Sequence, residues 1–368
     1  TDRFPHEKEG IIKFYGACRK VFNCLDSMPL LSIEDPNYLL KVFFKAPLSC
    51  LGLARWLPIN VGDVARRFIK DPELLKFIDI ECFCWSVMPA LKTPMINAGM
   101  VFTDRHVGGI NYPKGGVGTI AEKLVKGLEN LGSKIRFKAN VKEIIIRNNK
   151  AVGVKLQNGE EIFAKTIVSN STRWDTFGLK NIKNGLVKQE FVSKKEYIWS
   201  KNYKPSPSFV SIHIGVEKNI INPNFNCHHI IVDKWDELED EKGVIFISIP
   251  TLLDKNLAPE GKHIVHAFTP SSMNKWENLS RKEYLEKKED YFKFIINKIS
   301  KIIPDIKDSI DHKEIGTPKT HKKFLGRFQG SYGPIPNKKL LGLLPMPFNT
   351  TNVKNLYCVG DSCFPGQG

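Results

Sequence analysis

The end of the chain, residues 355–368, constrains the fold more than any other segment. Residues 356–359 are an apolar run that predicts a short buried strand, which Gly360 and Asp361 end. Residues 365–368 then predict a loop that starts a helix. A carboxylate at the end of a strand accepts hydrogen bonds from ribose or ribityl hydroxyls, and glycines let backbone N–H groups approach a pyrophosphate or a flavin carbonyl.

Length and composition are those of a soluble globular protein. With 368 residues, of which 42% are hydrophobic and 10% aromatic, the chain is long enough for two domains with their own cores. It contains no run of 18 or more apolar residues, so no transmembrane helix is predicted. The eight cysteines lack metal-ligand spacing, which favours reduced, mostly buried thiols and no metal site. Cys82 and Cys84 are two residues apart, a spacing that would place both thiols on the same side if the segment were a strand.

The formal net charge of +16 raises the question of an acidic partner. The lysines are dispersed, with small clusters at 194–195, 287–288 and 322–323, and no nucleic-acid-binding motif accompanies them. Solvated faces are the favoured interpretation, attraction to an anionic membrane surface comes second, and no nucleic-acid partner is predicted.

The N-terminal region has the periodicity of helices. Apolar residues recur along 7–85 at the spacing of one helix face, and further helices are expected at 36–45, 47–56, 61–69 and 72–84. Within this region the stretch 48–57 is notably apolar, which is typical of a core and also of a lipid-facing segment.

The rest of the chain alternates between strands and helices. A glycine-rich loop at 113–118 precedes an amphipathic helix at 119–130, and strands are expected at 141–147, 151–156, 161–164 and 166–170. A helix, a β-meander and a return strand fit one half of a nucleotide-binding α/β domain. Strands are also expected at 208–216, 228–232, 244–249 and 263–268, before a long helix at 281–302. Residues 315–347, rich in glycine and proline, are expected to be extended loops.

Several segments, taken in this order, resemble known flavoproteins. Residues 108–124, 139–144, 168–170 and 359–361 resemble the FAD-binding parts of amine oxidases and carotenoid desaturases. Other segments resemble the carotenoid isomerases, also called prolycopene isomerases: KDPELLKFI at 70–78, TPMINAGM at 93–100, STRWDT at 171–176, EIGTPKTH at 314–321, SYGPIP at 331–336 and GDSCFPGQG at 360–368. The resemblance covers nearly the whole chain.

The resemblance implies an α/β fold with an α+β substrate part. Its FAD-binding domain is Rossmann-like (GR2-type), and its substrate domain is a mixed sheet with helices. The expected boundaries are a helical substrate- or membrane-facing part at 1–105, FAD-binding segments at 106–180 and 349–368, and a substrate-binding domain at 181–348. The family's N-terminal βαβ unit and closing helix are expected to lie outside these residues, so the chain is expected to be a fragment that lacks the main pyrophosphate cradle.

The same resemblance assigns residues to the cofactor. It implies that the backbone of Val141 contacts the adenine and that Asp361 binds a ribityl or ribose hydroxyl. Gln367 and Gly368 are expected near the flavin. The remaining members of the cofactor-binding set are Ser169, Asn170, Gly360 and Gly366. Simpler interpretations stay open, because Val141 is equally explained as strand core and Asn170 as a helix cap.

No catalytic residue is assigned. Arg173 is expected to be a structural partner of Asp175 or of a glutamate. Some histidines are candidate acids or bases at neutral pH, although a lone histidine is more often structural: His106, His213, His263, His266 and His321.

The function that the resemblance implies is cis–trans isomerisation of poly-cis carotenes with reduced FAD and without net redox change. NAD(P)H is a candidate electron source. A hydrocarbon substrate needs an apolar tunnel, which helices within 40–100 are expected to line, and peripheral attachment to a plastid membrane is expected through 48–57 and nearby lysines. The alternatives are an FAD-dependent carotenoid desaturase or retinol-saturase-like oxidoreductase, and an inactive membrane-associated scaffold.

Overall fold

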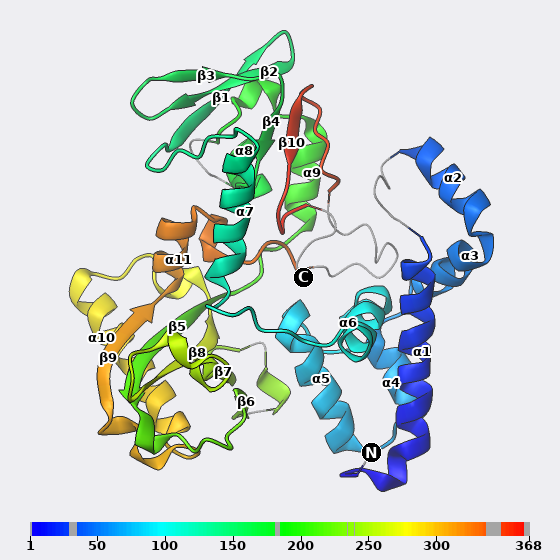
Figure 1. Ribbon diagram of the computed structural model, residues 1–368. Coiled ribbons are helices and arrows are strands. Elements are labelled where there is room, and N and C mark those ends of the chain that lie inside the picture. The colour runs from blue at the N-terminus through cyan, green and yellow to red at the C-terminus, as the bar shows by residue number, and fades with distance from the viewer. Residues whose placement is uncertain are drawn as a thin grey trace.

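The computed structural model describes residues 2–28, 35–180, 185–233, 235–238, 240–335 and 347–363. Figure 1 shows three groups of elements: the helices α1 to α6, a small sheet of β1 to β3 with β4 and β10 beside it, and a larger sheet of β5 to β9 with α10. The architecture is therefore the mixture of helices and sheets that the sequence predicts.

The N-terminal group is helical, as expected. Its helices are α1 (Lys8–Asp26), α2 (Pro36–Lys45), α3 (Pro47–Trp56), α4 (Val61–Phe68), α5 (Pro72–Ser86) and α6 (Met95–Val107). The core lies mainly between α1 and α6, where Phe14 packs edge-on against Phe102 with ring centroids 5.5 Å apart. Gly99 allows this approach, since a Cβ there would lie 2.6 Å from Val21. Within the described residues, no helix has the length and apolar character needed to cross a bilayer.

The start and the helical conformation of α5 follow from its sequence, as predicted for residues 72–84. Asp71 caps the helix by accepting hydrogen bonds from the N–H groups of Glu73 and Leu74, at 2.9 and 3.0 Å. Cys82 and Cys84 both lie in this helix, where two residues span about 200° of rotation. Consequently Cys82 is buried and Cys84 is exposed, rather than both facing one side of a strand.

The second group consists of two small sheets and several helices. Strands β1 (Val141–Arg147), β2 (Lys150–Leu156) and β3 (Glu161–Phe163) form an antiparallel meander, and β4 (Ile167–Ser169) pairs in parallel with β10 (Leu356–Cys358). The helices are α7 (Gly118–Asn130), α8 (Arg173–Phe177) and α9 (Lys194–Asn202). These strands confirm the predicted meander and return strand.

The apolar side of α7 is uncovered. Ile120, Leu124 and Leu128 follow one another at the spacing of one helix face, and 53%, 66% and 48% of their surfaces are exposed. No residue of α7 is buried. The amphipathic pattern therefore correctly predicts the helix, while its apolar face has no partner among the described residues.

The third group is an antiparallel sheet with the strand order β6-β7-β8-β5-β9. Its strands are β5 (Ser208–Glu217), β6 (His228–Val232), β7 (Val244–Ser248), β8 (Lys262–Ser271) and β9 (Ile310–Gly316). Helix α10 (Arg281–Ile299) packs its apolar side on one face of the sheet, where alternate residues of β5 such as Ile212 and Ile214 are buried.

The prediction of extended loops at 315–347 is wrong for the first part of this range. Gly316 ends β9, and α11 (Pro318–Leu325) follows at once. Thr317 caps this helix by accepting a hydrogen bond from the N–H of Thr320, and Gly326 ends it with φ of +59°. The glycines and prolines that suggested loops are thus the start and stop signals of a short helix. Residues 336–346 lie outside the described residues.

Candidate functional site

The carboxyl ends of β4 and β10 form one edge, called here the cofactor edge: Ser169, Asn170, Gly360 and Asp361. The two strands are parallel, with Val168 opposite Tyr357 and Ser169 opposite Cys358. The N–H of Val359 continues the pairing by donating to the carbonyl of Ser169 at 2.9 Å. Parallel strands of an α/β fold bind their ligands at such carboxyl ends. The structure therefore brings together four residues that the resemblance assigned to the cofactor.

The backbone at this edge requires glycine. Gly360 has φ of +92°, and a Cβ at this position would lie 2.6 Å from Oδ1 of Asn170. The amide of Asn170 is exposed and lies directly against the Gly360 backbone. Asn170 and Gly360 are both exposed, and Gly360 carries no side chain of its own at this edge.

Asp361 is held by an arginine that the sequence analysis did not identify. Arg327 forms an ion pair with the Asp361 carboxylate, and its Nε donates to the carbonyl of Ser331 at 2.6 Å. Gly333 is packed against the backbone of Asp361, since a Cβ on this glycine would lie 2.6 Å from the Asp361 carbonyl oxygen. The segment 327–333 thus fixes the position of the carboxylate, and no local sequence signal indicated this contact.

The other predicted cofactor residues lie in different places. Ser169 is buried, and its hydroxyl forms a hydrogen bond of 2.9 Å with the hydroxyl of Thr176, so it points inward rather than to solvent. Val141 begins β1 in the separate meander and pairs with Leu156. Gly366, Gln367 and Gly368 lie outside the described residues. Direct contact of any of these residues with a cofactor stays a prediction.

A buried ion pair lies next to the cofactor edge. Arg173 and Glu196 are 3% and 4% exposed, and the guanidinium donates to both carboxylate oxygens at 2.7 and 2.6 Å. Burial by itself lowers the pKa of Arg173, but the hydrogen bonds and charge of Glu196 outweigh it and hold this pKa above its ordinary value. Arg173 also donates to the carbonyls of Phe348 and Thr350, at 2.9 and 3.3 Å. The expected structural role of Arg173 is confirmed, with a glutamate rather than Asp175 as its partner.

Two buried thiols flank the end of β10. The Cys358 thiol donates a hydrogen bond to the Cys363 sulfur and, with the Arg173 guanidinium 3.7 Å away, lowers the pKa of Cys363 despite its burial. The pKa of Cys358 is raised by the same hydrogen bond and by burial. Both thiols are fully buried, as predicted for most of the cysteines.

The glycine-rich loop before α7 contacts the larger sheet. Gly115 and Gly116 have φ of +85° and +88°, conformations that favour glycine. The N–H of Gly115 donates to Oδ2 of Asp254 at 2.7 Å, which lowers the pKa of that carboxyl. This N–H group therefore already has a protein acceptor, Asp254, which lies in the connection between β7 and β8 of the larger sheet.

Three of the candidate histidines gather on the face of the sheet opposite α10. The rings of His213 and His266 lie opposite each other on β5 and β8, with centroids 4.5 Å apart. Burial, assisted by the neighbouring imidazole of His213, lowers the pKa of His266 to about 4. His321 packs on the ring of Phe209 at 4.1 Å, and its buried Nε2 has no hydrogen-bond partner among the described residues. All three have lowered pKa values and are neutral at pH 7.

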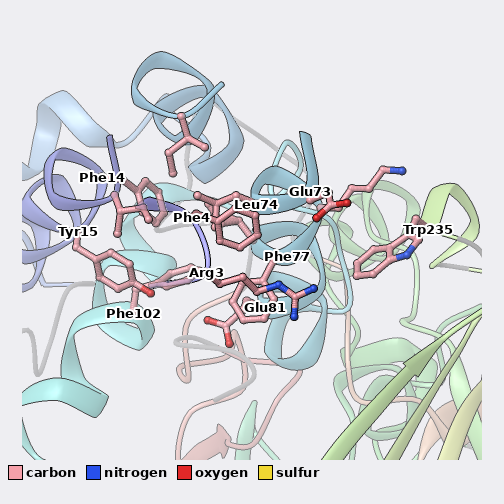
Figure 2. Close-up of a pocket in the computed structure, with 14 residues that line it drawn as sticks. Arg3, Phe4, Phe14, Tyr15, Glu73, Leu74, Phe77, Glu81, Phe102 and Trp235 are labelled. Carbon is pink, nitrogen blue, oxygen red and sulfur yellow. The ribbon is translucent and has the colours of Figure 1, made fainter. Parts of the chain in front are cut away.

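A cavity of about 680 Å³ lies in the helical part (Figure 2). Its wall is mostly apolar: the rings of Phe14, Tyr15 and Phe102 meet edge-on at 5.5 to 6.0 Å, and Phe77 of α5 and Trp235 lie across from them. The volume is in the range of small-molecule sites. None of the four residues of the cofactor edge lines this cavity.

Comparison with known proteins gives the family. The sequence pattern of the flavin containing amine oxidoreductases matches residues 60–365. The chain belongs to this family. Among solved structures, the chain is similar to an oxidoreductase from Methanosarcina mazei, with a TM-score of 0.56 and 17% identity over 83% of this chain and 63% of that one. This likeness shows the fold alone.

Curated relatives are more similar in sequence. Over its full length the chain is 57% identical to "Prolycopene isomerase, chloroplastic" of Daucus carota and 56% identical to the protein of the same name of Arabidopsis thaliana. It covers 59% and 61% of these two proteins. The chain thus spans about three fifths of the length of the relatives that it matches.

The cofactor that the family implies is FAD, and the cofactor edge fits part of it. Asp361 would accept a hydrogen bond from a ribityl or ribose hydroxyl, because its carboxylate is positioned by Arg327 and is 18% exposed. Gly360 is exposed and carries no side chain of its own, so its main-chain groups are accessible at this edge. The described residues therefore suit the sugar side of the cofactor.

Proposed function

We propose that this chain is the larger part of a plastid prolycopene isomerase, which converts poly-cis carotenes into the all-trans form with reduced FAD and without net redox change. The observation that carries this proposal is sequence identity of 56% to 58% with four plant prolycopene isomerases, along the whole chain rather than in the cofactor motifs alone. Names of the relatives also support the plastid location.

The roles of the residues follow from the geometry of the cofactor edge. Asp361, fixed by Arg327, holds the sugar part of the cofactor, and Gly360 keeps the main chain open beside Asn170. The buried pair of Arg173 and Glu196 supports this edge. When bound, reduced FAD would supply the proton or electron density that briefly lowers the order of a double bond, and the protein positions the polyene and excludes water.

The proposed enzyme also binds a membrane surface, from which a carotene is delivered. The surface that supports this is the apolar side of α2 and the start of α3, called here the α2–α3 patch: Leu39, Leu40, Phe43, Phe44, Leu48 and Leu51. Phe44 and Leu48 are 79% and 83% exposed. Exposed Lys41, Lys45 and Arg55 border the patch, so it combines apolar side chains with charges that attract anionic lipids. Leu53, within the apolar stretch 48–57, is instead buried in the core.

Isomerase activity is tested on the full-length protein. It is incubated anaerobically with tetra-cis-lycopene, FAD and either dithionite or NADPH. The carotenes are then separated by chromatography, and their masses are measured by mass spectrometry. We expect all-trans-lycopene of unchanged mass, formed only with reduced flavin. A product that has lost or gained two hydrogens would identify a desaturase or a saturase, and bound FAD without turnover would favour another substrate.

Membrane binding is tested by co-sedimentation with liposomes that contain phosphatidylglycerol. The variant F44S/L48S is expected to stay in the supernatant, while F324S, which changes an aromatic residue that is 76% exposed on α11, is expected to sediment like the wild type. Equal sedimentation of both variants would refute the α2–α3 patch as the membrane-binding surface.

A further inference from the structure

Five aromatic rings form a continuous line along the face of the larger sheet, β5 to β9, that lies opposite α10. This aromatic row consists of Phe83, Phe246, Phe268, Phe209 and Tyr332. Neighbouring ring centroids are 6.4, 4.9, 5.5 and 5.1 Å apart in this order, and three of the four contacts are stacked. Aromatic pairs at such spacings attract one another beyond the effect of burial alone.

The strand register produces the row. Phe246 of β7 lies directly opposite Phe268 of β8, and Phe209 of β5 lies diagonally from Phe268, two residues from its partner Ser211. Because side chains alternate along a strand, the residues between them point to the other face, where Ile247 and Ala267 belong to the core under α10. These strands therefore contribute aliphatic residues to the core under α10, and their phenylalanines lie on the opposite face.

The row is not a closed core of its own. Phe268 and Tyr332 remain 38% and 42% exposed in the middle and at one end. Only the Phe83 end is fully covered, where α5 packs against the sheet through Ile80 and Val244. A line of rings with exposed faces is a feature of ligand-binding surfaces rather than of a solvated sheet face.

The exposed end of the row leads to the cofactor edge. Tyr332 immediately precedes Gly333, which is packed against the Asp361 backbone, and Ser331 accepts a hydrogen bond from Arg327, the ion-pair partner of Asp361. The other end lies on α5, whose opposite side contributes Leu74 and Phe77 to the cavity of Figure 2. The row therefore runs from the helical part to the place proposed for the cofactor.

We infer that the accessible part of the aromatic row, from Phe268 through Phe209 to Tyr332, is the binding surface for the conjugated chain of the substrate, with Tyr332 nearest to the bonds that are isomerised. This inference rests on the proposed function. A long hydrocarbon offers no hydrogen-bonding group, so a flat apolar surface of aligned rings is what holds and orients it. The continuity of the row with the cofactor edge is the reason to assign it to the substrate rather than to another protein segment.

The inference is tested by carotene binding to the full-length protein with oxidised FAD and no reductant, so that turnover does not contribute. Tetra-cis-lycopene in detergent micelles is titrated while its absorption shift and induced circular dichroism are recorded. We expect F209L and F268L each to weaken binding about two- to tenfold, the effect of losing one aromatic contact. F324L, which changes an exposed ring away from the row, is the matched control and is expected to bind like the wild type.

Two further readouts separate the possible outcomes. The flavin absorption spectrum and the urea midpoint show that F209L and F268L retain the cofactor site and the fold. If the wild type binds carotene and both variants bind it as F324L does, the inference is overturned. If the wild type itself binds no carotene, the proposed function fails, and the inference fails with it.

Discussion

Replacing Glu196 by glutamine is expected to destabilise the protein strongly, because it leaves the buried charge of Arg173 without a counter-ion. Both side chains are almost completely buried, and the carboxylate accepts two hydrogen bonds, at 2.7 and 2.6 Å. Removing one partner of a buried ion pair costs about 3–5 kcal/mol. The backbone acceptors Phe348 and Thr350 satisfy other N–H groups of the guanidinium but carry no full negative charge. We therefore expect a loss of about 4 kcal/mol.

The assay is equilibrium unfolding in urea, followed by circular dichroism. Glu190→Gln is the matched control, since Glu190 is exposed near the start of α9 and its loss is expected to cost less than about 0.5 kcal/mol. Combining Arg173→Met with Glu196→Gln removes the stranded charge. The double variant is thus expected to lose at least about 1 kcal/mol less than the sum of the two single variants.

The reasoning fails if Glu196→Gln unfolds at the same urea concentration as Glu190→Gln, or if the two single effects simply add. Either result would mean that water reaches the pair and screens it. A stable Glu196→Gln variant that had lost FAD binding would instead give the pair a role in the cofactor edge without a role in global stability.

Three other changes test different parts of the molecule. Acidification from pH 6.5 towards 4 is expected to lower the free energy of unfolding by about 1–2 kcal/mol through His266. The pKa of His266 is about 4 in the folded protein and higher in the unfolded chain, so the unfolded chain takes up the proton first. Because the ring is half-exposed, solvent screening reduces the full effect. H266Q should flatten this part of the stability–pH curve, and an unchanged curve would contradict the assignment. G360A is expected to lose about 1–3 kcal/mol of stability and to bind FAD more weakly, because φ at this position is +92° and the new Cβ would meet Asn170. The control G127A, in open space on α7, should be neutral or stabilising in the same urea and flavin-fluorescence measurements. Equal behaviour of the two variants would count against backbone strain at Gly360. F14A should lower the free energy of unfolding in urea by about 3–5 kcal/mol, because the ring is fully buried. The control is I12A, at an exposed position, and a loss no larger than that of I12A would show that this core repacks.

The sequence predicted most secondary structure because the deciding signals are local. Asp71 and Pro72 start α5, and the left-handed residues Asn148 and Asn149 make the tight turn between β1 and β2. The error at 315–325 arose because glycine and proline mark both loops and helix ends, and only the cap formed by Thr317 distinguishes the two. Local signals of this kind fix where an element begins and ends, but not what it packs against.

The sequence by itself determined the family and the order of the elements, and it predicted a cofactor site at the end of β10, because these depend on residue types at fixed spacing. Only the tertiary structure decided that Arg327 holds Asp361, that Glu196 neutralises Arg173, and that phenylalanines from α5, β7, β8 and β5 meet in one row. These contacts join residues far apart in the chain. They depend on strand register and on how the helical part docks on the sheet, which no local pattern encodes.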